Sequence, residues 1–134
     1  MIYLLDANVL VHLANRVQGA ERIEQRLISE PRARVRLSAA TAHELRYMIV
    51  RAKASRAHVA ALDALVRQFR VEPFDLPAAH AAADVRAHLE ERGRPIGIFD
   101  MLLSGHARRL AATIVSDDGD FDRVPGLARE NWLR

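Results

Sequence analysis

The chain has 134 residues, half of them hydrophobic and 28% charged, with a formal net charge of +3 at pH 7. This length and composition predict one globular domain over residues 1–134. No cysteine is present, which excludes a disulfide framework, a thiolate metal site and a cysteine nucleophile. The apolar run Ile2–Leu5 is too short for a signal peptide or a membrane span and follows no basic leader. We therefore expect a cytoplasmic protein that is not bound to a membrane.

The basic residues are almost all of one kind. Nineteen of the 20 are arginine, and Lys53 is the one lysine. The planar guanidinium group matches phosphate, so an anionic partner fits this composition. A genome rich in alanine and arginine codons would give the same bias, so charge alone does not identify the partner.

Five short segments are predicted to form strands. Met1–Leu5, Val35–Leu37 and Ala112–Val115 are mainly apolar, as expected of strands buried on both faces. Phe69–Val71 and Asn131–Leu133 are weaker candidates.

Between these segments, apolar residues recur at helical spacing. The predicted stripes are Leu45, Met48, Ile49 and Ala52; Leu62, Leu65, Val66 and Phe69; Val85 and Leu89; and Leu103, Ala107 and Leu110. Pro77 is predicted to begin a helix, and residues 93–97 to interrupt the next connection. Strands that alternate with helices imply right-handed crossovers. The predicted fold is therefore α/β, a three-layer α/β/α sandwich with a central, mostly parallel five-stranded sheet.

Acidic residues occur where such a sheet binds its ligands, at the carboxyl ends of strands near the reversal of strand order. Asp6 follows the first predicted strand, and Glu44 borders the apolar stripe of its helix. Asp100 begins a helix after an apolar segment. After the Ala112–Val115 strand, four aspartates fall within six residues: Asp117, Asp118, Asp120 and Asp122.

Each acid alone also has a structural explanation. Asp6 or Asn8 could cap the helix that follows, and Asp100 could cap its own helix. Glu44 fits a capping box with Thr41. The aspartate run could be a polar turn, and its spacing does not match an EF-hand.

Taken together, the acids favour a cation site. Two carboxylates about 4 Å apart repel by about 4 kcal/mol at an effective dielectric of 20. Such a cluster either takes up protons or binds a cation. Ligands that are all oxygen favour Mg²⁺ or Mn²⁺. The six histidines are scattered and are expected to have surface or packing roles.

The motifs that contain these acids resemble those of PIN-domain ribonucleases, and among them the VapC-like toxins of type II toxin–antitoxin pairs. The resemblance extends nearly from end to end. It is carried by Asp6-Ala7-Asn8, by residues 38–45, by residues 93–100 (Gly-Arg-Pro-Ile-Gly-Ile-Phe-Asp) and, most specifically, by residues 115–127.

The resemblance implies roles for individual residues. Asp6, Glu44, Asp100 and Asp118 would be the catalytic, metal-binding acids, and Asp120 a further metal ligand. Asp117 is the alternative if the register of the aspartate run differs. Asn8 and Ser116 would orient the acids and the attacking water, Ser116 standing where threonine is more usual. Arg94 and Arg123 are candidate RNA phosphate contacts, with solvated surface charge as the alternative.

The resemblance also implies the reaction and the partners. The activity would be Mg²⁺- or Mn²⁺-dependent hydrolysis of RNA phosphodiesters, leaving 5′-phosphate and 3′-hydroxyl ends. The partners would be a VapB-type antitoxin, which inserts a basic side chain into the acidic site, and a second copy of the chain in a homodimer.

Other functions remain open at this point. The chain could be a PIN-fold RNA-processing nuclease outside a toxin–antitoxin pair, or a non-catalytic module that binds nucleic acid or protein. A haloacid-type phosphatase needs a second aspartate where this chain has Asn8. A phospho-acceptor receiver domain needs a lysine after a late strand, whereas the one lysine is Lys53.

Overall fold

The computed structural model describes residues 1–134. Its centre is a five-stranded sheet in the order β3-β2-β1-β4-β5, with every neighbouring pair parallel. The strands are β1 (Tyr3–Leu5), β2 (Val35–Ser38), β3 (Arg70–Glu72), β4 (Thr113–Val115) and β5 (Ala128–Glu130). In the central pair, Tyr3 and Leu5 of β1 are opposite Thr113 and Val115 of β4.

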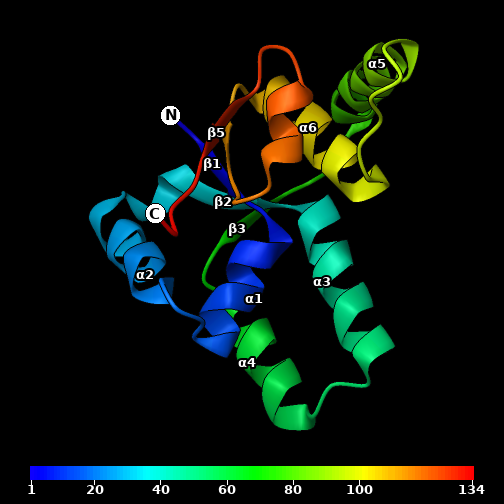
Figure 1. The fold of residues 1–134 in the computed structure, drawn as a ribbon. Helices are drawn as coiled ribbons and strands as arrows, with labels where there is room; N and C mark the ends of the chain where they lie inside the picture. Colours follow the sequence, from blue (N-terminus) through cyan, green and yellow to red (C-terminus); the bar gives the residue numbers. More distant parts are fainter.

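Six α-helices and two 3₁₀ turns connect the strands. The helices are α1 (Ala7–Asn15), α2 (Ala20–Ser29), α3 (Ala39–Ala52), α4 (Arg56–Val66), α5 (Leu76–Glu91) and α6 (Ile98–Leu110). The 3₁₀ turns are η1 (Arg32–Arg34) and η2 (Gly119–Arg123). In Figure 1, α1, α2 and α4 lie on one side of the sheet and α5 and α6 on the other, so the predicted three-layer sandwich is confirmed.

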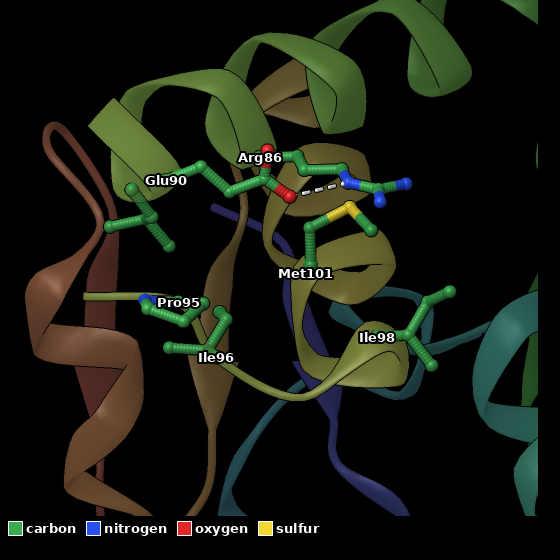
Figure 2. A pocket seen from close by; sticks show the side chains of 7 residues that line it. Arg86, Glu90, Pro95, Ile96, Ile98 and Met101 are labelled. Carbon is green, nitrogen blue, oxygen red and sulfur yellow. Dashed lines mark hydrogen bonds and ion pairs between the residues drawn. The ribbon is translucent and has the colours of Figure 1, made fainter. Parts of the chain in front are cut away.

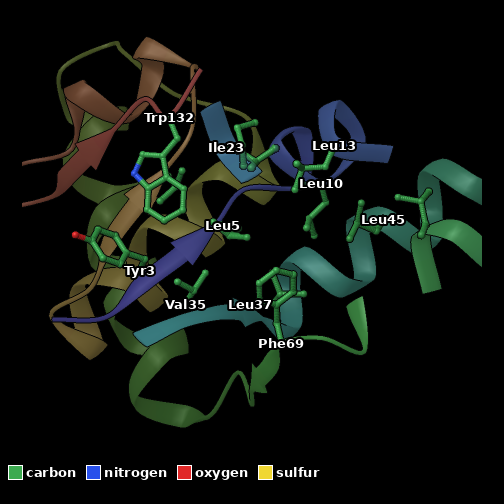
Figure 3. Packing of buried hydrophobic residues seen from close by; sticks show 14 of the residues in the cluster. Tyr3, Leu5, Leu10, Leu13, Ile23, Val35, Leu37, Leu45, Phe69 and Trp132 are labelled. Atoms are coloured by element: carbon green, nitrogen blue, oxygen red, sulfur yellow. The ribbon is translucent and has the colours of Figure 1, made fainter. Parts of the chain in front are cut away.

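The alternation of side chains along β1 builds a core on each face of the sheet. Tyr3 and Leu5 belong to the larger core, which contains residues of α1 to α4. Figure 3 shows this core, with Trp132 packed edge-on against Tyr3 at 5.2 Å between ring centroids. Leu4 faces the opposite way and packs with Ile114 and α6.

Helices α5 and α6 pack closely because α6 has a glycine at their crossing. A Cβ atom at Gly105 would lie 2.3 Å from the backbone N and Cα of Ala82. No side chain fits in that space, so the contact between the two helices requires glycine. This crossing positions α6, which carries Asp100 in its first turn.

Two of the predicted boundaries are wrong. The last strand is Ala128–Glu130 and not Asn131–Leu133, because the apolar Trp132 and Leu133 pack into the core from the segment after β5. Phe69 does not continue the helical stripe of α4, which ends at Val66, and it reaches the same core from the loop before β3.

None of the helices is both long enough and apolar enough to span a lipid bilayer.

Candidate metal centre

The acids gather at the point where the strand order reverses. The chain passes from β1 to β2 on one side of β1, and β4 pairs with β1 on its other side. Crevices form at such a reversal, outside the carboxyl ends of the strands. Asp6 follows β1 directly, and its backbone N–H donates to the Val115 carbonyl oxygen at 3.0 Å.

Asp6 is buried and held by Ser116. The Asp6 residue is only 3% exposed, and its Oδ2 accepts a 2.8 Å hydrogen bond from Ser116 Oγ. Asp6 occupies the N-cap position of α1, but its side chain makes no capping hydrogen bond there and instead accepts the bond from Ser116. Burial raises the pKa of Asp6, whereas the hydrogen bond from Ser116 lowers it.

Ser116 also organises the aspartate turn, which is the segment of residues 116–122 after β4. Its Oγ accepts from the backbone N–H of Asp118 at 3.0 Å, and Asp118 Oδ1 in turn accepts from the N–H of Asp120 at 2.9 Å. The polar-turn explanation therefore describes part of what Asp118 does. Asp117 is exposed, whereas Asp118 and Asp120 are half-buried.

Glu44 and Asp100 are on helices that meet beside the strand ends. Helix α3 begins one residue after Ser38, which accepts from the N–H of Ala40 at 3.0 Å and so caps it. Glu44 is therefore the sixth residue of α3, and the capping-box explanation with Thr41 is wrong. Asp100 is in the first turn of α6, but its side chain makes no cap hydrogen bond.

A buried histidine connects these two helices. His106 of α6 is 1% exposed, and its Nδ1 shares a 2.7 Å hydrogen bond with Ser38 Oγ. Burial lowers the pKa of His106, so the ring is neutral at physiological pH. Its role is structural, because this contact fixes the start of α3 against α6.

Three carboxylates are close enough to share one ion. Single oxygen atoms of Asp100, Asp118 and Asp120 all lie within 4.8 Å of one another. At an effective dielectric of 20, two such charges at 4.8 Å repel by about 3.5 kcal/mol. Asp6 and Glu44 are outside this group of three, although their charges act on Asp100.

The ionisation of the acids reflects this crowding. Burial, followed by the charges of Asp6, Asp118, Glu44 and Asp120, raises the pKa of Asp100 to about 7. Burial and the charge of Asp6 also raise the pKa of Glu44. A cation would relieve the repulsion between these groups. The donors are carboxylate oxygens without sulfur or imidazole, so the site fits a hard divalent ion.

Of the other predicted residues, Arg123, Arg94 and Asn8, one makes a polar contact with an acid. Arg123 donates to the Pro95 carbonyl oxygen at 3.2 Å and pairs with Asp120 at 3.4 Å. Arg94 and Asn8 are exposed, and their side chains make no hydrogen bond within the chain. The structure thus pairs Arg123 with Asp120, whereas the side chains of Arg94 and Asn8 form no hydrogen bond or ion pair with the acids.

Arg129 was not predicted, although it contacts the aspartate turn. From β5 it donates to both carboxylate oxygens of Asp122 and to the Ser116 carbonyl oxygen. In the sequence, the opposite charges of Asp122 and Arg129 on either side of Pro125-Gly126 could have suggested this ion pair. However, opposite charges seven residues apart are common without being paired.

A separate pocket of about 130 Å³ lies between α5 and the segment that leads into α6 (Figure 2). Pro95, Ile96 and Met101 line one side of it. On α5, Arg86 and Glu90 form an ion pair of 2.9 Å. None of the clustered acids lines the pocket, so it is not part of the acidic site.

Comparisons with known proteins agree on one family. A model of the PIN domain matches residues 3–127. The tRNA(fMet)-specific endonuclease VapC of Shigella flexneri is 29% identical over 131 residues, 97% of each chain. Ribonuclease VapC2 of Rickettsia felis is 28% identical over 133 residues, 98% of each chain.

Solved structures give the same result. The structure of VapBC2 from Rickettsia felis, bound to a DNA fragment from its promoter, aligns with a TM-score of 0.86 at 27% identity, covering 98% of this chain and 99% of that chain. DNA-bound VapBC from Salmonella typhimurium gives a TM-score of 0.86 at 28% identity over 98% of each chain. The chain therefore belongs to the PIN-domain family, as its sequence motifs predicted.

Proposed function

We propose that this PIN-domain nuclease is an endoribonuclease that depends on Mg²⁺ or Mn²⁺ and hydrolyses RNA phosphodiesters. The observation that carries the proposal is the convergence of Asp100, Asp118 and Asp120 within 4.8 Å at the reversal of strand order. The names of its relatives, which are ribonucleases and tRNA(fMet)-specific endonucleases, support RNA as the substrate.

The proposed ligands of the cation are the carboxylates of Asp100, Asp118 and Asp120. Asp6 is proposed as a further ligand or as an acceptor for metal-bound water, and Glu44 adds negative charge beside Asp100. A divalent ion held there lowers the pKa of a bound water and balances charge on the phosphate. Asp100, whose pKa is raised to about 7 by burial and its acidic neighbours, would be held in its ionised form beside such an ion.

Neutral and basic side chains complete the proposed site. Ser116 favours the ionised form of Asp6, because its Oγ–H donates to that carboxylate. Arg123, beside Asp120, and Arg94, in the loop before α6, are proposed to contact RNA phosphates. Asn8 is proposed to orient the attacking water from the first turn of α1.

We further propose that the chain is the toxin of a VapBC-type pair and acts in the cytoplasm, where its RNA substrate would be found. Related structures are described as VapBC complexes, which supports a VapB-type antitoxin as partner. A basic antitoxin side chain entering the acidic site would replace the cation's charge and block the reaction. A homodimer is proposed as the state of the free toxin.

Cleavage of RNA by the purified chain tests the activity. The chain is stripped of metal with EDTA and incubated with an RNA pool, with or without added Mg²⁺ or Mn²⁺. We expect cleavage only with the cation, a loss of at least about 100-fold for Asp118→Asn and for Asp6→Asn, and no loss for Asp84→Asn. Asp84 is an exposed acid on α5, so it controls for the change in charge.

Two outcomes would contradict the proposal. Full-rate cleavage by Asp6→Asn and Asp118→Asn would show that these acids do not support the reaction. RNA that is bound but never cut, with either ion, would identify a nucleic-acid binding module instead of a nuclease.

A further inference from the structure

We infer that Arg129 is a positioning residue for the proposed cation site, one that holds the aspartate turn in place without touching ion or substrate. The inference rests on the proposed function, since it concerns the geometry of the proposed ligands. Arg129 is on β5, at the edge of the sheet, and its side chain is 20% exposed.

The guanidinium group holds both ends of the turn. Its Nε and Nη2 donate to Asp122 Oδ1 and Oδ2 at 2.9 and 2.8 Å, a two-bond fork. Its Nη1 donates to the Ser116 carbonyl oxygen at 3.0 Å. The proposed ligands Asp118 and Asp120 are in the segment between these two anchor residues.

Bonds inside the turn pass this restraint to the ligands. Ser116 Oγ accepts from the N–H of Asp118, and Asp118 Oδ1 accepts from the N–H of Asp120. When the ends of so short a segment are fixed, few backbone conformations remain for its middle. Three carboxylates that repel one another would otherwise move apart in the absence of an ion. Arg129 therefore keeps the ligands close before the ion arrives.

Charge and positioning predict opposite effects on metal affinity. The guanidinium group of Arg129 lies near Asp118 and Asp117. The pKa of Arg129 is raised mainly by the hydrogen bond with Asp122, and to a smaller extent by the charges of Asp118 and Asp117. A cation beside the site repels a divalent ion, so by charge alone removing Arg129 would tighten metal binding. If Arg129 positions the ligands, its removal weakens binding instead.

The test is the affinity of the metal-free full-length chain for Mn²⁺, measured by the loss of the electron paramagnetic resonance signal of free Mn²⁺. We expect the Kd to rise about tenfold for Arg129→Met. For Arg129→Lys, which keeps the charge but not the fork, we expect a rise of about threefold. Because lysine leaves the net charge unchanged, this variant isolates geometry and also serves if the methionine variant folds poorly.

Arg36→Met is the matched control. Arg36 pairs with Glu72 at 2.8 Å, its side chain is 21% exposed, and it is on β2 toward the opposite edge of the same sheet. We expect its Kd for Mn²⁺ to equal that of the wild-type chain, even where its melting temperature falls as much as that of Arg129→Met.

The inference is overturned if Arg129→Met binds Mn²⁺ as tightly as the wild-type chain or more tightly, if Arg129→Lys restores full affinity, or if Arg36→Met weakens binding equally. If the wild-type chain takes up no Mn²⁺, the proposed metal site fails and this inference fails with it. Cation uptake by the wild-type chain thus separates the two cases.

Discussion

Replacement of Asp100 by asparagine should stabilise the metal-free protein at pH 8. Burial and the charges of its acidic neighbours raise the pKa of Asp100 from 3.8 to about 7. The folded state therefore binds this proton more tightly than the unfolded state does. As the pH rises from about 4 through about 7, the wild-type protein loses stability, and the full cost is present above pH 7.

The size of the effect follows from the pKa shift. A shift of about three pKa units corresponds to about 4 kcal/mol. Asp100 is only half-buried and solvent screens its charge, so we expect about 1–2 kcal/mol. Its side chain makes no hydrogen bond that asparagine would lose. For a chain of this size the melting temperature should rise by roughly 3–8 °C.

Thermal unfolding in EDTA at pH 4 and pH 8 measures this effect, with Asp84→Asn as the control for an exposed acid. The gain should be present at pH 8 and nearly absent at pH 4. With Mg²⁺ at 100 times its Kd the order should reverse, because the ion adds about 2.7 kcal/mol to the wild-type protein alone. An Asp100→Asn protein that is no more stable than wild type in EDTA at pH 8 would show that the ionised Asp100 does not destabilise the metal-free fold.

Three further predictions concern the turn, the helix crossing and the register of the aspartates. Ser116→Ala should cost about 1–3 kcal/mol in denaturant unfolding, because buried Asp6 loses its hydrogen-bond donor, whereas Ser116→Thr should retain most of the stability. Gly105→Ala should destabilise by about 2–4 kcal/mol, and Ala82→Gly should not rescue it, since the clash is with backbone atoms. In RNA cleavage assays, Asp118→Asn should lose at least about 100-fold and Asp117→Asn less than about threefold, because Asp117 is exposed and outside the cluster of three; equal losses would contradict the assigned register.

The strands that were predicted best are those whose side chains are buried on both faces. Tyr3–Leu5 and Thr113–Val115 are fully buried, so their apolar character was visible in the sequence. The last strand was misplaced because Ala128–Glu130 is a half-exposed edge strand with two charged residues. Trp132, just beyond it, is buried by tertiary contacts with Tyr3, which a local pattern does not reveal.

The positions of two of the acids could be predicted from a rule of topology, whereas contacts made by long side chains could not. Asp6 and Asp118 follow from the rule that ligands bind at the carboxyl ends of parallel strands. The start of α3 was misjudged, because the sequence offered Thr41 as a cap and the structure uses Ser38. Arg129 could not be found from sequence, since its contacts with Ser116 and Asp122 depend on how β5 returns beside β4.

The most direct test of the central claim is calorimetric titration of the metal-free chain with Mn²⁺ at pH 6 and pH 8, in buffers of different ionisation enthalpy. We expect Mn²⁺ uptake that is tighter at pH 8 and that releases close to one proton at pH 6, because the ion displaces the proton held by Asp100. We also expect Asp118→Asn to abolish most of the uptake. No uptake by the wild-type chain, or uptake that releases no proton and survives Asp118→Asn, would contradict the claim that these acids form a divalent cation site.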